Sequence, residues 1–295
     1  MKYVIGVMRP PFLPLAVVCV FLGMSVAIWT DGDINIWYAV LCFVGGILAH
    51  GGVNAFNEYE DVKSGLDMKT TRTPSSGGSG TLIPVPSKVK IALWTGIATA
   101  VICTAIGIFF YTIHGWPILL LGLIGLLIIV VYTPWLNKIP ALCLVSPGIG
   151  FGTLMVNGTY FALTGHFSWA ALLASFVPFF LVSNLLLLNQ FPDADVDKEF
   201  GRKHYPILIG RKASAVIFTL FVVGSYLTLI LAVLLGFAPL WTLLGLVTLV
   251  FAIPAVRGAL KNAEDLPKLL PSLGQNVLLN LITPLLMGIG FLIGK

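Results

Sequence analysis

The sequence predicts an all-α polytopic membrane protein with about nine transmembrane helices. Of its 295 residues, 58% are hydrophobic and 10% are charged, and the mean hydropathy is +0.98. Soluble domains average roughly 45–50% apolar and about 25% charged residues. The apolar runs are continuous and reach the length of about 20 residues that a helix needs to cross a bilayer. They lack the alternating pattern of a transmembrane barrel, so helices are expected.

Nine apolar segments follow one another from end to end, with boundaries defined to within a few residues. They cover residues 12–30, 35–58, 88–113, 116–134, 141–163, 168–191, 213–235, 238–256 and 270–292. Only short turns separate the last pairs, so their division is the least defined part of the prediction. The first segment is longer than the roughly 7–15 residues of a secretion-signal core, and we expect it to be retained.

The positive charges are distributed asymmetrically along this pattern. If the N-terminus lies in the cytoplasm, sixteen of the seventeen Lys and Arg residues fall in cytoplasmic segments or adjacent helix ends. Those segments are 1–11, 59–87, 135–140, 192–212 and 257–269. This asymmetry follows the positive-inside rule and favours an odd number of spans. The net charge of +5 is therefore explained by membrane topology, and a nucleic-acid partner is not expected.

Two short acidic motifs, 132 residues apart, each follow a long apolar segment. The first reads Asn57-Glu58-Tyr59-Glu60-Asp61 and continues to Asp67; the second contains Asn189, Asp193, Asp195 and Asp197. Seven of the twelve acidic residues of the chain lie in these two motifs. They lead into the two longest hydrophilic connections, 59–87 and 192–212, and form with them the motif loops 57–87 and 189–212, which we expect on the same side of the membrane. The whole chain, 1–295, is predicted to form one transmembrane domain.

Helical spacing places the polar residues of each motif on one face. The first face carries His50, Asn54, Asn57 and Asp61, and the second carries Asn189, Asp193 and Asp197. Asp67 follows Gly65, and we expect it in a loop that folds back over the site. Polar faces on membrane helices are costly unless they meet partners or water. The two faces are therefore predicted to meet.

If the carboxylates of the two motif faces lie close together, a cation is needed to offset their repulsion. Two carboxylates about 5 Å apart repel by roughly 3 kcal/mol at an effective dielectric constant of 20. Carboxylate and carboxamide oxygens suit Mg²⁺ or Mn²⁺ and not zinc, and Mg²⁺ often completes its ligand shell with substrate phosphate. A single Asp-x3-Asp at a helix end is usually a solvated charge pair. Two Asn-led motifs flanked by basic loops instead favour a metal site for a diphosphate.

Several cations lie near the motifs and are candidate ligands of that diphosphate. They are Arg72, Lys138, Arg202, Lys203 and His204. By default each is also a positive-inside topology signal. The small residues that follow Arg72, up to Gly80, offer backbone N–H groups to phosphate, although a flexible linker has the same composition. His50 lies roughly 10 Å deeper than Asn57 along the helix, as a cavity-lining residue or a satisfied structural one.

At these residues the chain resembles the UbiA superfamily of intramembrane prenyltransferases. The matching features are Arg9-Pro10 before the first span, Asn57-x3-Asp61, Tyr132-Thr133 with the following Lys138, and Asn189-x3-Asp193-x3-Asp197-x3-Gly201. The spacing of Asn57, Asp61 and Asp67, with Tyr59 and Gly65, is similar to the MenA type. Those enzymes prenylate 1,4-dihydroxy-2-naphthoate for menaquinone biosynthesis.

The resemblance implies a helical bundle around a central cavity with a cytoplasmic cap. It implies two Mg²⁺ ions, with Mn²⁺ as an alternative, that hold an allylic isoprenoid diphosphate. The implied metal ligands are Asn57, Asp61, Asp193 and Asp197. The resemblance implies that Arg72, Lys138 and Lys203 or Arg202 neutralise the diphosphate. The helix faces add His50, Asn54 and Asn189 as candidate substrate-binding residues. Asp67 and Tyr132 are expected beside the reacting carbon, with Asp67 as the candidate base.

Two departures from the family pattern leave the acceptor open. The usual Asn-Asp pair of the first motif is Asn57-Glu58 here, and the run Arg202–Pro206 differs from that of quinone enzymes. Alternative acceptors are 4-hydroxybenzoate, homogentisate, a tetrapyrrole or a glycerol lipid. A transporter of cations or anionic lipid is the remaining alternative, but transporters place their ion ligands near the midplane. The predicted location is an integral membrane protein, in the cell membrane if the organism is a prokaryote.

Overall fold

The computed structural model describes residues 1–73 and 77–295, and these residues form helices and loops without a β-strand. In chain order the helices are α1 (Lys2–Val7), η1 (Pro10–Phe12), α2 (Pro14–Asp31), α3 (Ile36–Ser64), α4 (Leu66–Lys69), η2 (Pro86–Lys88), α5 (Lys90–His114), α6 (Trp116–Val131), η3 (Leu136–Lys138), α7 (Pro140–Gly148), η4 (Ile149–Val156), α8 (Asn157–Thr164), α9 (Trp169–Glu199), α10 (Tyr205–Leu208), α11 (Gly210–Leu234), η5 (Leu240–Thr248), α12 (Leu249–Asn262) and α13 (Leu266–Ile293).

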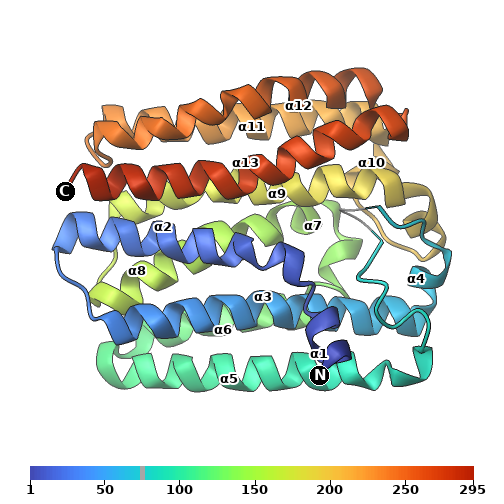
Figure 1. The fold of residues 1–295 in the computed structure, drawn as a ribbon, viewed down its shortest axis with the longest axis horizontal. Helices are drawn as coiled ribbons and strands as arrows, with labels where there is room; N and C mark the ends of the chain where they lie inside the picture. The colour runs from blue at the N-terminus through green and yellow to red at the C-terminus, as the bar shows by residue number, and fades with distance from the viewer. Residues whose placement is uncertain (74–76) are drawn as a thin grey trace.

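The helices run roughly parallel to the long axis of one bundle (Figure 1). Within the described residues, eight helical units are long and apolar enough to cross a membrane. The units α7–η4–α8 and η5–α12 each count once among these eight. The remaining predicted span is α6, which has 16 residues and is too short for the same criterion. The prediction of an all-α bundle with about nine membrane helices is confirmed.

The two helices that carry the motifs are long, and each has a side-chain N-cap. The Asn35 side chain accepts hydrogen bonds from the first turn of α3, and Ser168 does the same for α9, which satisfies N–H groups that a helix start leaves unpaired. The helices have 29 and 31 residues, or about 45 Å at 1.5 Å per residue. Because the hydrocarbon core is only about 30 Å thick, both helices carry their acidic ends beyond it.

The largest apolar core lies around α9, which packs against α7, η4, α11 and α13. Close approach of η4 to α9 depends on glycine: a Cβ on Gly152 would lie 2.3 Å from the main-chain nitrogen of Phe179. On the far side of the bundle, α6 buries only Ile118. The motif helices therefore have a densely packed apolar core on one side and a lightly packed helix on the other.

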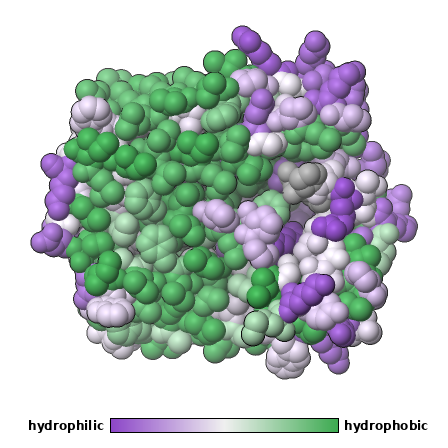
Figure 2. Space-filling view, viewed as in Figure 1, coloured by the Kyte–Doolittle hydropathy of each residue, from purple (hydrophilic) through white to green (hydrophobic). Residues whose placement is uncertain are grey.

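One end of the bundle is polar. Hydrophobic residues cover most of the face in Figure 2, and hydrophilic residues gather mainly at the end where α4 and α10 lie. A small apolar cluster of Val7, Ala55, Val62, Leu82 and Ala92 fastens α1 and the loop before α5 onto α3 and α5. Both motifs and the N-terminal helix therefore lie at the same end, where α4 also packs against α9.

Candidate active site

A cavity of about 580 Å³ lies inside the bundle between these helices. Its walls come mainly from α3, α5, α6, η4 and α9 and are largely apolar. At the polar end of the bundle it is lined by the motif residues Asn57, Asp61, Asp67, Asn189, Asp193 and Asp197. The predicted convergence of the two motif faces on one space is therefore seen in the structure.

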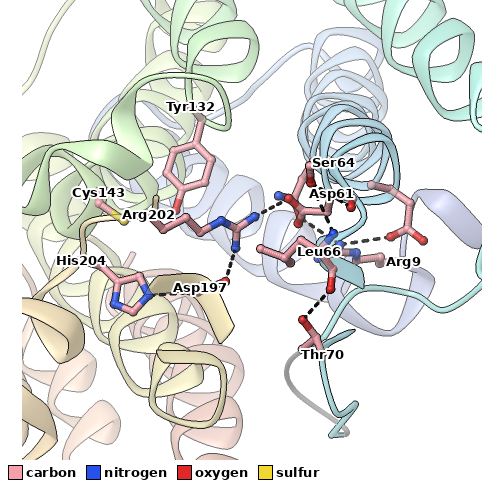
Figure 3. Close-up of polar contacts among 12 residues, drawn as sticks. Arg9, Asp61, Ser64, Leu66, Thr70, Tyr132, Cys143, Asp197, Arg202 and His204 are labelled. Carbon is pink, nitrogen blue, oxygen red and sulfur yellow. Dashed lines mark hydrogen bonds and ion pairs between the residues drawn. The ribbon is translucent and has the colours of Figure 1, made fainter. Parts of the chain in front are cut away.

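Arg202 joins the two motifs (Figure 3). One guanidinium nitrogen donates a hydrogen bond to Asp61 of α3, and Nη1 donates to Oδ1 of Asp197 on α9 at 3.1 Å. The turn after α9 makes this possible, because Gly201 has φ +75° and the Arg202 main-chain N–H returns to the Asp197 carbonyl at 3.1 Å. His204 contacts the other Asp197 oxygen at 3.0 Å. A single cation thus balances one carboxylate from each motif.

This bridge is shielded from solvent. The side chains of Arg202, Asp61 and Asp197 are 19%, 8% and 2% exposed. Burial lowers the pKa of Arg202, but the Asp61 and Asp197 carboxylates outweigh it and raise that pKa above its ordinary value. Arg202 therefore remains protonated, and its charge stays between the two carboxylates.

A second ion pair was not predicted from the sequence. Arg9 lines the cavity, and its Nη2 donates to Asn57 Oδ1 at 2.8 Å and to Glu58 Oε2 at 3.1 Å. Glu58 is fully buried and also accepts hydrogen bonds from the main-chain nitrogen and the hydroxyl of Ser79. The residue that departs from the family's Asn-Asp pair thus ties the N-terminal segment and the following loop to α3. The only hint of this role of Arg9 in the sequence was the Arg9-Pro10 pair before the first span.

Asp67 lies in the short helix α4 and not in the predicted loop. It is 2% exposed, and neither carboxylate oxygen has a hydrogen-bond partner among the described residues. Burial, together with the charges of Asp61 and Glu58, raises the pKa of Asp67 to about 7. A Cβ on Gly78 would lie 2.6 Å from Asp67 Oδ2, so glycine allows the loop to pass directly over this carboxyl group.

The other predicted cavity residues also line it. The Tyr132 ring lies beside Arg202 (Figure 3), with its hydroxyl 3.9 Å from Cys143 Sγ. His50 is buried and meets Phe151 edge to face, with ring centroids 4.5 Å apart. Asn54 donates a hydrogen bond to a carbonyl of the N-terminal segment at 3.0 Å. Asn189 Oδ1 is buried without a partner among the described residues.

Three predicted cations lie elsewhere. Arg72, Lys138 and Lys203 are exposed and do not line the cavity. Arg72 donates to the main-chain oxygen of Ser79 at 2.6 Å. Of the small residues that follow Arg72, 74–76 lie outside the described residues, so the predicted backbone phosphate contacts are not placed there. Sequence position alone did not separate Arg202, which enters the site, from Lys203, which points to the surface.

The donor set fits a hard divalent cation. The buried oxygen of Asn189 and both oxygens of Asp67 lack partners among the described residues, and Mg²⁺ prefers such oxygen ligands. Within that same part of the chain, no three His, Cys, Asp or Glu side chains form a ready metal cluster. The guanidinium of Arg202 instead supplies the positive charge between Asp61 and Asp197. A divalent cation placed between these two carboxylates would have to displace Arg202.

The comparison with protein families decides the class. The model of the UbiA prenyltransferase family matches residues 16–269. The chain belongs to the UbiA prenyltransferase family. This UbiA protein is thus a prenyltransferase and not a transporter, and its helices make it an integral membrane enzyme.

Curated relatives cover nearly the same length. The chain is 26% identical to a 1,4-dihydroxy-2-naphthoate octaprenyltransferase of Bacillus subtilis, over 97% of this chain and 90% of the relative. It is 24% identical to a 2-carboxy-1,4-naphthoquinone phytyltransferase of Synechocystis, over 87% and 82% of the two chains. The enzyme therefore resembles prenyltransferases of naphthoate compounds along most of its length.

Solved structures share the fold. A UbiA homolog from Aeropyrum pernix superposes with a TM-score of 0.73 at 18% identity, over 97% of this chain and 98% of that one. A UbiA homolog from Archaeoglobus fulgidus, solved with DMAPP and Mg²⁺, gives a TM-score of 0.58 at 15% identity over the full length of both chains. The Archaeoglobus fulgidus protein thus binds DMAPP and Mg²⁺ in the same fold.

Replacing Arg202 tests whether it competes with metal. We expect Arg202→Gln to bind Mn²⁺ roughly tenfold or more tightly than the wild type without diphosphate. The reason is that charged hydrogen bonds of about 1.5–3 kcal/mol no longer oppose the metal. Electron paramagnetic resonance of free Mn²⁺ in detergent measures this affinity.

The matched control is Arg211→Gln. Arg211 pairs with Asp195 at 2.8 Å on the outer side of α9 and does not line the cavity. Its replacement should leave Mn²⁺ affinity unchanged. Equal or weaker Mn²⁺ binding by Arg202→Gln would contradict the competition.

Asp67 gives a prediction about pH. The pKa of Asp67 in the folded protein is about 7, above the ordinary value of 3.8. The folded state therefore favours the protonated carboxyl group. The stability that this gives is fully present below about pH 4 and is lost as the pH rises through 7. Asp67→Asn should therefore raise the melting temperature of metal-free protein at pH 8 and leave it unchanged at pH 4. The same shift at both pH values in thermal unfolding would contradict a buried titrating carboxyl group.

Proposed function

We propose that this enzyme transfers a prenyl group from an allylic isoprenoid diphosphate to 1,4-dihydroxy-2-naphthoate, a step of menaquinone biosynthesis. The observation that carries this proposal is the meeting of Asp61 and Asp197, from separate motifs, at the polar end of a large apolar cavity. The names of the relatives support the naphthoate acceptor. All of residues 1–295, including the motif loops 57–87 and 189–212, would form one catalytic domain.

The metal ligands in this proposal are Asn57, Asp61, Asp193 and Asp197, with Asn189 beside them. They would hold two Mg²⁺ ions, or Mn²⁺, together with the diphosphate. Bound by these residues, the ions would supply positive charge to the leaving diphosphate, which would make a proton donor for the C1–O bond unnecessary.

Arg202 and Arg9 are the cations best placed to bind the diphosphate. If a metal ion were held by Asp61 and Asp197, the Arg202 guanidinium would be free to pair with phosphate oxygens. Arg9 already lies in the cavity wall, and its Nε is buried without a partner among the described residues. Arg72, Lys138 and Lys203 act on the diphosphate only if the loops that carry them close over it.

The apolar part of the cavity protects the allylic cation that ionisation leaves. Water at C1 would convert this cation to an alcohol, and the Leu, Ile and Phe side chains of the walls exclude it. Tyr132 adds a cation–π contact worth roughly 1–2 kcal/mol. The electron-rich acceptor ring then attacks C1, and Asp67 takes the proton that the ring loses. A folded pKa of about 7 suits this group to act as a base near neutral pH.

The orientation in the membrane follows from charge. We infer that the end carrying α1 and both motifs faces the cytoplasm, because nearly all Lys and Arg residues belong to segments at that end. Within the cavity, His50 would contribute to the wall against the acceptor, and Asn54 holds the N-terminal segment that carries Arg9. Other acceptors use the same chemistry, so the acceptor is the part of the proposal that most needs a test.

The acceptor is tested by transfer of radiolabelled geranylgeranyl diphosphate to a panel of aromatic compounds, with Mg²⁺ or with EDTA. We expect Mg²⁺-dependent product with 1,4-dihydroxy-2-naphthoate and little with 4-hydroxybenzoate or homogentisate. Product formed only with another acceptor would keep the chemistry and refute the naphthoate assignment. The same transfer rate in EDTA as in Mg²⁺ would refute the proposed metal dependence.

The motif carboxylates are tested by Asp61→Asn and Asp193→Asn. We expect each variant to fold and to lose roughly 10²- to 10³-fold or more in kcat, because charge stabilisation of the leaving group is removed. Asp195→Asn is the matched control, since Asp195 lies two positions from Asp193 but is 84% exposed and pairs with Arg211. Normal turnover in either motif variant would contradict the metal-site assignment, as would an equal loss in the control.

A further inference from the structure

Three asparagines lie buried in the apolar part of the bundle, away from the motifs. Asn184 belongs to α9, and Asn276 and Asn280 belong to α13; none is more than 1% exposed. Each side-chain nitrogen donates to a main-chain carbonyl, but each side-chain oxygen is buried without a partner among the described residues. An unpaired buried acceptor costs about 1–3 kcal/mol, so such a group in native protein needs an explanation.

Asn280 differs from the other two because it lines the cavity. Its Nδ2 donates to the Asn276 carbonyl at 2.9 Å, and this fixes the amide, since only the NH₂ group can face a carbonyl oxygen. The oxygen Oδ1 is therefore the atom left over. Pro284 lies four residues further along α13 and lacks the N–H that would bond the main-chain carbonyl of Asn280. Asn280 thus has two hydrogen-bond acceptors, Oδ1 and its main-chain carbonyl oxygen, without the partners among the described residues that a purely structural asparagine would have.

His50 supplies a second polar group at a similar depth. It lies fourteen residues before the end of α3, and Asn280 lies fourteen residues after the start of α13, so each is about 21 Å along its helix from the polar end. His50 also lines the cavity, and its Nδ1 is buried without a partner among the described residues. Because α2 packs against both α3 and α13, the two groups lie on walls that flank α2.

We propose that Asn280 is a specificity-determining residue that accepts a hydrogen bond from a hydroxyl group of the aromatic acceptor, with His50 as a second polar group in the cavity wall. The inference rests on the proposed prenyl transfer to a dihydroxynaphthoate and names the contact that recognises it. A carboxamide oxygen requires a donor, so it selects a hydroquinone-type O–H over a quinone carbonyl or a ring without that hydroxyl group. A site built to bond a hydroxyl group discriminates strongly against analogues that lack it.

The test compares ligands that differ by one hydroxyl group. Isothermal titration calorimetry in detergent, with Mg²⁺ and an unreactive thiodiphosphate present, gives dissociation constants for 1,4-dihydroxy-2-naphthoate, 1-hydroxy-2-naphthoate and 4-hydroxy-2-naphthoate. In the wild type, we expect loss of one of the two hydroxyl groups to weaken binding about tenfold or more. Binding that ignores both hydroxyl groups overturns the proposal without any variant.

Asn280→Leu, which keeps the side-chain size, identifies the residue. We expect this variant to bind the dihydroxy compound and one monohydroxy compound about tenfold more weakly. Its affinity for the compound that lacks the contacted hydroxyl group should stay unchanged. Equal weakening of all three ligands, or of none, overturns the role of Asn280. Asn280→Ser is the second variant if the leucine form does not fold, and the same pattern is required of it.

Asn276→Leu is the matched control. It removes a neighbouring buried asparagine that does not line the cavity, so it should lower the melting temperature and keep the wild-type order of the three ligands. The two hypotheses remain separable. If wild-type protein binds none of the naphthoates, the proposed acceptor fails and the inference with it, whereas good binding without hydroxyl dependence overturns the inference alone.

Discussion

The contact on which the active end depends is the buried bridge from Asp61 through Arg202 to Asp197. Two carboxylates brought together in a poorly solvated site repel each other, and removing one partner of a buried ion pair is strongly unfavourable. The guanidinium therefore holds the ends of α3 and α9 together in the metal-free protein. In the proposed mechanism, a divalent cation together with the diphosphate would take its place between the same oxygens.

The bilayer explains where the rest of the chemistry lies. Charged groups are expensive in hydrocarbon, and α3 and α9 carry theirs beyond it because both exceed the membrane thickness. Deeper in the bundle the cavity wall is apolar, which suits a long isoprenoid and a reactive carbocation. Among the described residues, His50 Nδ1 and Asn280 Oδ1 are buried in that part of the bundle without a hydrogen-bond partner, which is costly. Their retention is understandable if a substrate supplies that partner.

Local patterns predicted the spans and the motif faces well. Hydrophobic length sets the helices, and steps of three and four residues set which side chains share a face. The meeting of the two motif faces was predicted, but the individual side-chain pairs between distant segments were not: Arg9 contacts Asn57 and Glu58 across 48 and 49 residues. Which of Arg202 and Lys203 enters the site depends on the turn at Gly201. The position of Asp67 depends on the one-turn helix that follows Gly65. Asn280 was missed although Asn276 lies four residues earlier on the same apolar helix, because neither asparagine stands beside an acidic motif.

The most direct test of the account is an experimental structure with Mn²⁺ and an unreactive isoprenoid thiodiphosphate, with the metal located by anomalous scattering. The account predicts metal density between the carboxylates of the two motifs, with Arg202 turned from Asp61 and Asp197 onto the diphosphate. Metal bound elsewhere, or an Arg202 that still joins both carboxylates while the diphosphate is held, would contradict it.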